Sequence, residues 1–190
     1  MDTGLNMNAT DLLFELTTRY TEAHRRYHDL RHIADMLCKG ASLDLNEEQR
    51  MAIWFHDAVY EPGSKDNEED SADLAVQKLI AAGWPVDRAQ VVAEIIRDTK
   101  GHQPSIEESK KVLDLDLSTL GGSWEEYQRN GANIRAEFAN LSDAEWNAGR
   151  SDWLRAMLGR ERLFWTEWGT PLEKQARENL QRDLDQLNGS

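Results

Sequence analysis

A histidine and an aspartate stand side by side at the end of an apolar run, Ala52-Ile53-Trp54-Phe55-His56-Asp57. The run predicts burial, and burying an imidazole and a carboxylate without partners costs several kcal/mol. A metal cation satisfies both side chains at once, because it binds imidazole nitrogen as well as carboxylate oxygen. A His–Asp surface pair at a helix end is the ordinary alternative. Further histidines and aspartates in predicted helices favour a metal site over such a surface pair.

Two more histidines, His28 and His32, precede this pair in the chain. They are four residues apart, so on a helix both project from one face. That spacing is compatible with both binding one metal. It is equally compatible with one binding the metal while the other faces a substrate.

Two aspartates, Asp114 and Asp116, follow later in the stretch Val112-Leu113-Asp114-Leu115-Asp116-Leu117. On a helix they point roughly 200° apart, so we expect only one of them to face the core. Asp116 lies beside the apolar stripe that includes Leu117 and Leu120, and it is therefore the expected inward carboxylate. Asp114 is expected to be dispensable.

The predicted ligands are His32, His56, Asp57 and Asp116. Such a mixed nitrogen and oxygen set suits Mn²⁺, Fe²⁺, Co²⁺, Ni²⁺ or Zn²⁺, and Mg²⁺ is also considered. Cys38 is the single cysteine, which excludes an internal disulfide and a structural zinc–cysteine site.

The elements that must position these residues are helical throughout, so the predicted fold class is all-α. Proline is rare, and the sequence shows no period-two alternation. The predicted helices cover approximately residues 10–27, 27–37, 46–60, 68–82, 87–99 and 105–120. Capping boxes are predicted at Asn46-Glu47-Glu48-Gln49 and at Ser105-Ile106-Glu107-Glu108.

The last third differs, because it is rich in tryptophan and contains no histidine. Capping boxes at Ser123 and Ser142 begin two further helices. We predict a single domain over 1–190, with a metal-site core at about 20–120 and a helical packing layer at about 123–187. A tryptophan-rich substrate wall is the less favoured alternative, since aromatic residues at helical spacing usually belong to a core.

The composition limits the partners. The 190 residues carry a formal net charge of -13, which disfavours nucleic-acid polymers and anionic membrane surfaces. No apolar run approaches the ~20 residues that span a bilayer. Residues 1–6 lack the features of a secretory signal, so a cytoplasmic protein is expected. A small phosphorylated ligand and a homo-oligomer remain compatible with the sequence.

The order His…His-Asp…Asp on a helical chain resembles the HD superfamily of metal-dependent phosphohydrolases, over roughly residues 20–120. Trp54-Phe55-His56-Asp57 carries the motif that names the family, and Leu115-Asp116-Leu117 is similar to its final aspartate. The resemblance implies hydrolysis of a small phosphoester, a nucleotide or a related phosphometabolite, by water activated at a divalent metal ion. Asp57 or Asp116 would orient that water.

Tyr27-His28, followed by His32 and Asp35, is also similar to the start of the cyclic-nucleotide phosphodiesterase site. This likeness implies that His28 is the general acid and that His32 is a metal ligand.

The chain departs from the two-metal members, which have further histidines after the His-Asp pair. Here only His102 is present, as a second-site ligand or as a loop residue. Glu68 and its acidic neighbours could add carboxylates or simply begin a solvated helix. We expect one metal, or one strong and one weak site. Arg31, with Arg25 and Arg26, could bind a substrate phosphate or form surface ion pairs.

Two rival functions belong to other classes. One is a metal- or nucleotide-binding module with little turnover on the same scaffold. The other is a di-iron oxygenase, which needs more ligands than the sequence offers. Measuring the metal content separates the oxygenase from the hydrolase, because the oxygenase would hold two irons per chain and the hydrolase one exchangeable divalent ion.

Overall fold

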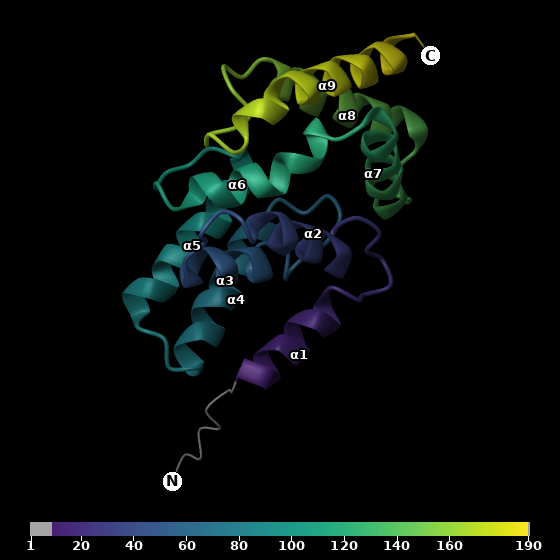
Figure 1. Ribbon diagram of the computed structural model, residues 1–190. Helices are drawn as coiled ribbons and strands as arrows, with labels where there is room; N and C mark the ends of the chain where they lie inside the picture. Colours follow the sequence, from purple (N-terminus) through teal and green to yellow (C-terminus); the bar gives the residue numbers. More distant parts are fainter. Residues whose placement is uncertain (1–8, 190) are drawn as a thin grey trace.

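The computed structural model describes residues 9–189, and in this range the chain is all helical, without a strand. The predicted all-α fold class is thus confirmed (Figure 1). The α-helices are α1 (Ala9–Arg19), α2 (Leu30–Gly40), α3 (Glu47–Phe55), α4 (Asn67–Ala81), α5 (Val86–Gly101), α6 (Ser109–Leu117), α7 (Trp124–Glu137), α8 (Asp143–Leu158) and α9 (Glu173–Asn188). Two 3₁₀ turns, η1 (Ser118–Gly121) and η2 (Thr170–Leu172), precede α7 and α9.

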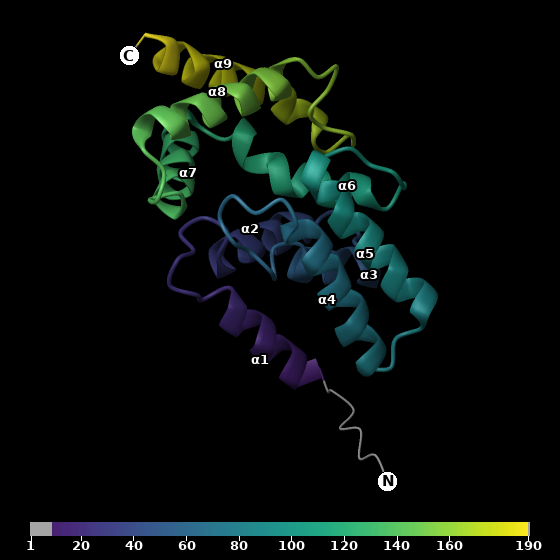
Figure 2. The same cartoon turned by 180° about the vertical axis from the view of Figure 1, so that it is seen from behind.

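The helices surround two apolar cores. The first core joins α1 to α6 and contains side chains such as Ile33, Phe55 and Leu115. The second joins the end of α6 to α7, α8 and α9, through residues such as Leu117 and Leu180. Figures 1 and 2 show α1–α5 at one end of the molecule, α7–α9 at the other, and α6 between them. The single domain with a C-terminal packing layer stays a prediction.

Capping residues begin several helices where the sequence predicts them. Asn46 with Gln49, Ser123 with Glu126, and Ser142 with Glu145 form reciprocal capping boxes. The box predicted at Ser105 is wrong. The Ser105 backbone N–H and hydroxyl both donate to Asp98 instead, at 2.8 and 3.0 Å, and α6 begins at Ser109.

The first two predicted helices are shorter than expected. The first ends at Arg19, and α2 begins only at Leu30, because the Asp29 side chain caps it by accepting from the Arg31 N–H. His28 therefore lies in a connecting segment, and the prediction that His28 and His32 share a helical face is wrong. The third predicted helix also stops early, with His56 as its C-cap.

The expectation that only one aspartate of α6 faces inward is wrong as well. The Asp114 side chain is buried, and it accepts hydrogen bonds from the Trp165 N–H at 2.7 Å and the Thr166 N–H at 2.8 Å. The Thr166 hydroxyl donates a third at 2.6 Å. The segment after α8 covers this face of α6, so both faces of the helix are buried.

Within residues 9–189, no helix combines the length and the apolar character needed to cross a membrane. The prediction about the N-terminal residues 1–6 lies outside the described range.

Candidate metal centre and its cavity

Three buried or half-buried side chains converge where α2 meets the end of α3. His32 is on α2, His56 caps α3, and Asp57 follows it. The Nε2 atoms of the two histidines are 3.3 Å apart, and Asp57 Oδ2 lies 3.0 Å from His56 Nε2 and 4.0 Å from His32 Nε2. These three residues could hold a metal ion, since one donor atom from each lies within 4.8 Å of the others.

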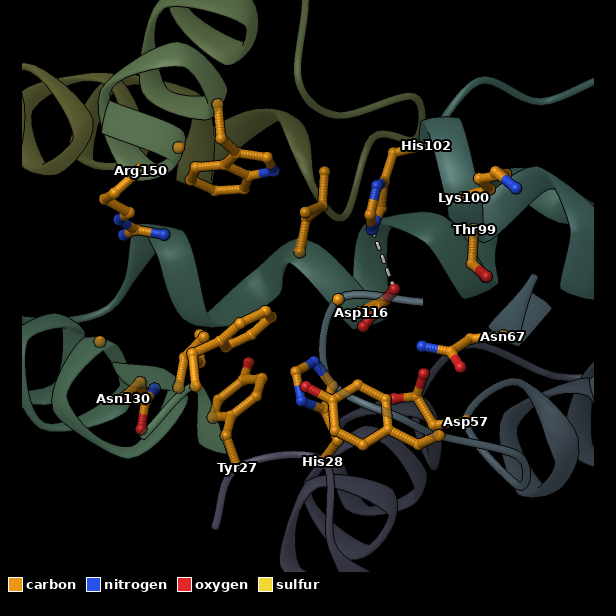
Figure 3. Close-up of a pocket in the computed structure, with 18 of the residues that line it drawn as sticks. Tyr27, His28, Asp57, Asn67, Thr99, Lys100, His102, Asp116, Asn130 and Arg150 are labelled. Carbon is orange, nitrogen blue, oxygen red and sulfur yellow. Dashed lines mark hydrogen bonds and ion pairs between the residues drawn. The ribbon is translucent and has the colours of Figure 1, made fainter. Parts of the chain in front are cut away.

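A fourth side chain, Asp116 of α6, reaches the same cluster. Its Oδ1 lies 3.1 Å from His32 Nε2 and 3.8 Å from His56 Nε2. Its Oδ2 lies 3.0 Å from Nε2 of His102, an interaction drawn in Figure 3. His102 is the C-cap of α5 and has a left-handed φ of 47°. The structure thus brings the predicted ligands together and places His102 beside them.

The arrangement of donor atoms in this cluster favours a proton or a metal ion between His56 and Asp57. His56 Nδ1 lies 2.9 Å from the Ile53 carbonyl oxygen, which can only accept, so Nδ1 carries the proton. The lone pair of a neutral His56 would then point from Nε2 at the Asp57 carboxylate. Two facing acceptors repel each other unless a proton or a metal ion lies between them.

Without a metal, the proton takes that place. Burial disfavours a charged His56, but the Asp57 carboxylate outweighs burial and raises the pKa of His56 to about 9. Burial likewise opposes ionisation of Asp57 and Asp116, yet the neighbouring histidines hold the pKa of both carboxyls well below the usual range. A divalent cation bound here would displace that proton, as metal binding to histidine generally does.

His28 is positioned by a residue that the sequence analysis missed, Glu137 at the end of α7. His28 Nδ1 and Glu137 Oε2 are 2.6 Å apart. Glu137 Oε1 accepts from the backbone N–H groups of Arg26, Tyr27 and His28 at 2.7, 2.7 and 3.0 Å. The Tyr60 hydroxyl donates to Oε2 at 2.9 Å. One buried carboxylate therefore holds the whole segment that carries His28.

His28 and Glu137 each stabilise the charged form of the other. Burial opposes the ionised form of Glu137, but His28 and the backbone N–H groups outweigh it and lower the pKa of Glu137 to about 2. Burial also opposes the imidazolium, while the Asp57 and Glu137 carboxylates raise the pKa of His28. The His28 ring lines the cavity described below, so its charged form has access to a ligand.

The arginines that could bind a substrate phosphate, Arg25, Arg26 and Arg31, do not line the cavity of about 510 Å³ beside the cluster. Arg25 is buried, and its Nη1 donates to the carbonyl oxygens of His28 at 2.9 Å and Asp57 at 2.8 Å, which ties the two site segments together. Arg31 is exposed and bonds to Asp29 through both Nε and Nη2. It lines a different cavity, of about 490 Å³, together with Arg26.

A cavity of about 510 Å³ opens beside the cluster and is shown in Figure 3. His28, Asp57, His102 and Asp116 contribute to its lining. Glu68 also lines it, 3.8 Å from the ammonium of Lys100. Its opposite wall comes from α7 and α8 and includes Trp146 and Trp153. Two of the tryptophans thus line the cavity, and the tryptophan-rich substrate wall stays a prediction.

Comparison with known proteins yields no match, whether with protein-family models, curated proteins or solved structures. The class that fold and site define is an all-α protein with a buried histidine–aspartate centre that could hold a metal ion.

Proposed function

We propose that the protein is a metal-dependent phosphohydrolase of the HD type, acting on a small phosphoester. One observation carries the proposal. The Nε2 atoms of His32 and His56 are 3.3 Å apart, and one carboxylate oxygen of Asp57 and one of Asp116 each lie within 4.0 Å of both Nε2 atoms. They do so at the lining of a cavity of about 510 Å³, large enough for a small ligand.

The four side chains would hold one divalent ion of the Mn, Fe, Co, Ni, Zn or Mg series. When bound, such an ion supplies Lewis acidity that activates water and neutralises charge on phosphoryl oxygens. A single site is supported by the donor groups, since His32, His56 and Asp57 form the one such group found within residues 9–189.

His28 is the proposed general acid. Its Nδ1 is committed to Glu137 at 2.6 Å, so Nε2 is the ring atom left to donate a proton to the leaving oxygen. The Asp57 and Glu137 carboxylates raise the pKa of His28, and the Glu137 carboxylate stabilises its imidazolium form. Proton donation of this kind typically contributes about 10²–10⁴-fold to the rate.

Asp57 has a second proposed role. Its Oδ2 faces His56 at 3.0 Å, while the residue also lines the cavity. The other carboxylate oxygen can accept a hydrogen bond from the attacking water and align it with the phosphorus. Lys100, which lies on the same side of the cavity as Asp57 in Figure 3, would supply a positive charge in place of the arginines expected there.

The test is phosphate release from a panel of nucleotides and simple phosphoesters, each with Mn²⁺, Mg²⁺, Ni²⁺ or Co²⁺. We expect release that requires the metal and is lost in His56→Ala. A protein that binds one metal per chain but releases no phosphate from any of these compounds would be the binding module instead. Two irons per chain would favour the oxygenase.

A further inference from the structure

The wall of the cavity contributed by α7 and α8 has no role in the proposed chemistry. On α8, Trp146, Gly149, Arg150 and Trp153 line the cavity, with Glu145 one position before them; on α7 the lining positions are Tyr127, Asn130, Gly131 and Ile134. Both sets follow the i, i+3, i+4, i+7 spacing of a single helical face. In Figure 3, Arg150 and Asn130 lie on the opposite side of the cavity from Asp57 and Asn67.

The wall is aromatic, and arginine side chains lie over the rings of Trp146 and Trp153. The guanidinium of Arg150 lies 4.6 Å from the centroid of the Trp153 ring, and that of Arg135 lies 5.5 Å from the centroid of Trp146. Phe138 packs against Trp146 with centroids 5.4 Å apart. Because arginines already use these ring faces, a positively charged ligand would be repelled. Trp146 and Trp153 also line the cavity, so a flat, uncharged ring could pack against the parts of these rings that face it.

Arg150 adds a directional donor to this wall. Its Nε and Nη2 donate to Asp183 Oδ2 at 3.1 and 2.9 Å, and Nη2 also donates to the Tyr127 hydroxyl at 2.8 Å. Asp183 balances its charge and fixes its orientation. Within residues 9–189, Nη1 has no hydrogen-bond partner, so it remains able to donate to a ligand acceptor.

Two glycines keep the wall open. A Cβ built on Gly131 or on Gly149 meets no atom within 4 Å. Glycine is unfavourable inside a helix, yet here each stands on a face that lines the cavity. Larger side chains at these positions would extend into the cavity.

We propose that this wall, the α7–α8 subsite, binds the non-reacting part of the substrate, and that this part is a flat, uncharged aromatic or heteroaromatic ring with a hydrogen-bond acceptor directed at Arg150. The inference rests on the proposed function, because it assumes that a phosphoryl group lies at the histidine–aspartate cluster. Asn130 would complete recognition at the polar edge of the ring.

The test measures binding of phosphonates, which cannot be hydrolysed, to the metal-loaded protein by calorimetry. The probes are phenylphosphonate, 2-naphthylphosphonate and coumarin-7-phosphonate, whose second ring carries a carbonyl acceptor. We expect 2-naphthylphosphonate to bind about tenfold more tightly than phenylphosphonate, because the added ring stacks in the subsite.

Gly131→Leu should remove this preference by filling the subsite, while phenylphosphonate binds as before. Ala132→Leu is the matched control, since it adds the same side chain to the exposed face of α7 and should leave the preference intact. Arg150→Lys keeps the charge opposite Asp183 but loses the planar fork, so it should weaken coumarin-7-phosphonate several-fold more than 2-naphthylphosphonate.

The outcomes separate the two proposals. A ring preference that is equal in the wild type and in Gly131→Leu, or absent from both, overturns the subsite even if phosphate is released from small esters. A ring preference that Gly131→Leu abolishes, in a protein that releases no phosphate, upholds the subsite and removes the hydrolase.

Discussion

Two histidines of the site differ in the partner of Nδ1, and this difference sets their proposed roles. His56 donates from Nδ1 to the Ile53 carbonyl, which leaves Nε2 facing Asp57 and Asp116. His28 directs Nδ1 at the Glu137 carboxylate, which favours the charged ring. The Ile53 carbonyl thus orients His56 as a proposed metal ligand, and the Glu137 carboxylate favours the charged form of His28, the proposed acid.

Substitution of the two histidines on either side of Asp29 should separate these roles. His32→Ala should lose metal and all activity together. His28→Ala should keep the metal and the fold but lose about 10²–10⁴-fold in rate on alkyl phosphates, the usual contribution of a general acid. The deficit should shrink for p-nitrophenyl phosphate, whose leaving group needs no proton. Equal losses on both substrates, or metal loss from His28→Ala, would refute the acid role.

Glu137→Gln should change how stability depends on pH. The folded-state pKa of Glu137 is lowered from 4.5 to about 2, so its stabilisation is fully present above pH 4.5 and disappears as the pH falls towards 2. The shift is equivalent to roughly 3 kcal/mol. The free energy of unfolding should therefore fall less steeply in Glu137→Gln than in the wild type between about pH 5 and pH 3. Parallel curves from urea titrations would contradict the lowered pKa.

The same variant should also reduce activity without removing the metal. The amide introduced by Glu137→Gln would offer a donor to His28 Nδ1, which favours the neutral ring. Phosphate release from poor leaving groups should fall, whereas metal content by mass spectrometry should match the wild type. Loss of metal from Glu137→Gln would mean that Glu137 supports the ligands rather than the acid.

Sequence alone identified the residues whose type carries a signal at short range. His56 and Asp57 are adjacent in an apolar run, and Asp116 lies beside the stripe of Leu117 and Leu120, so at least partial burial could be predicted. His56 is buried, and both aspartates are half-buried. Glu137 could not be, because its partner His28 is 109 positions away in the chain. A glutamate near a helix end is usually solvated, and only tertiary structure reveals the N–H groups around this one.

At the scale of elements, α6 is the helix that the sequence described least well. Leu115 packs in the first core and Leu117 in the second, so α6 is buried on opposite sides. Helical periodicity predicts one buried face and cannot show that a later segment covers the other. The position of Asp114 follows from that segment, which runs from Gly159 to η2.

Asp114→Ala should therefore be destabilising rather than neutral. It removes a buried carboxylate that accepts three hydrogen bonds from Trp165 and Thr166. Leaving those donors unpaired should cost about 2–4 kcal/mol, measured by urea unfolding. The exposed Asp152→Ala should change stability little. An Asp114→Ala variant as stable as the wild type would mean that the segment is held otherwise.

Gly169→Ala should destabilise through the same contact. A Cβ at this position would overlap the Asp114 carboxylate and the Phe164 side chain. We expect a loss of about 1–3 kcal/mol in the free energy of unfolding, typical of overpacking. Gly101→Ala, where a Cβ meets nothing within 4 Å, is the matched control and should be neutral or stabilising. Equal stabilities of the two variants would refute the close packing.

The connecting segment before α2 also lay beyond sequence-based prediction. Asp29 has the side chain of a helix N-cap, but the apolar spacing on either side is compatible with continuous helix. The Asp29 cap begins α2, and contacts distant in sequence hold the segment before it, since Arg25 donates to the Asp57 carbonyl and Glu137 accepts from three N–H groups. The conformation of the segment before α2 thus depends on residues that meet only in the folded site.

At the scale of the whole molecule, the cavity lies between the two cores. The first supplies the histidine–aspartate cluster, and α7 and α8, which contribute to the second, supply Glu137 and the α7–α8 subsite. The C-terminal third was predicted chiefly as a packing layer, because tryptophans at helical spacing fit a core. It also provides the residue that orients the proposed acid, so truncation before α7 should remove catalysis.

The most direct test of the central claim is the metal content of purified protein after loading with Mn²⁺ or Ni²⁺ and removal of free ions. We predict about one divalent ion per chain in the wild type and in His28→Ala. His56→Ala and Asp116→Ala should each lose it, with a lower melting temperature because the ion stabilises only the folded state. Full metal content in both variants would contradict the claim and place the metal elsewhere.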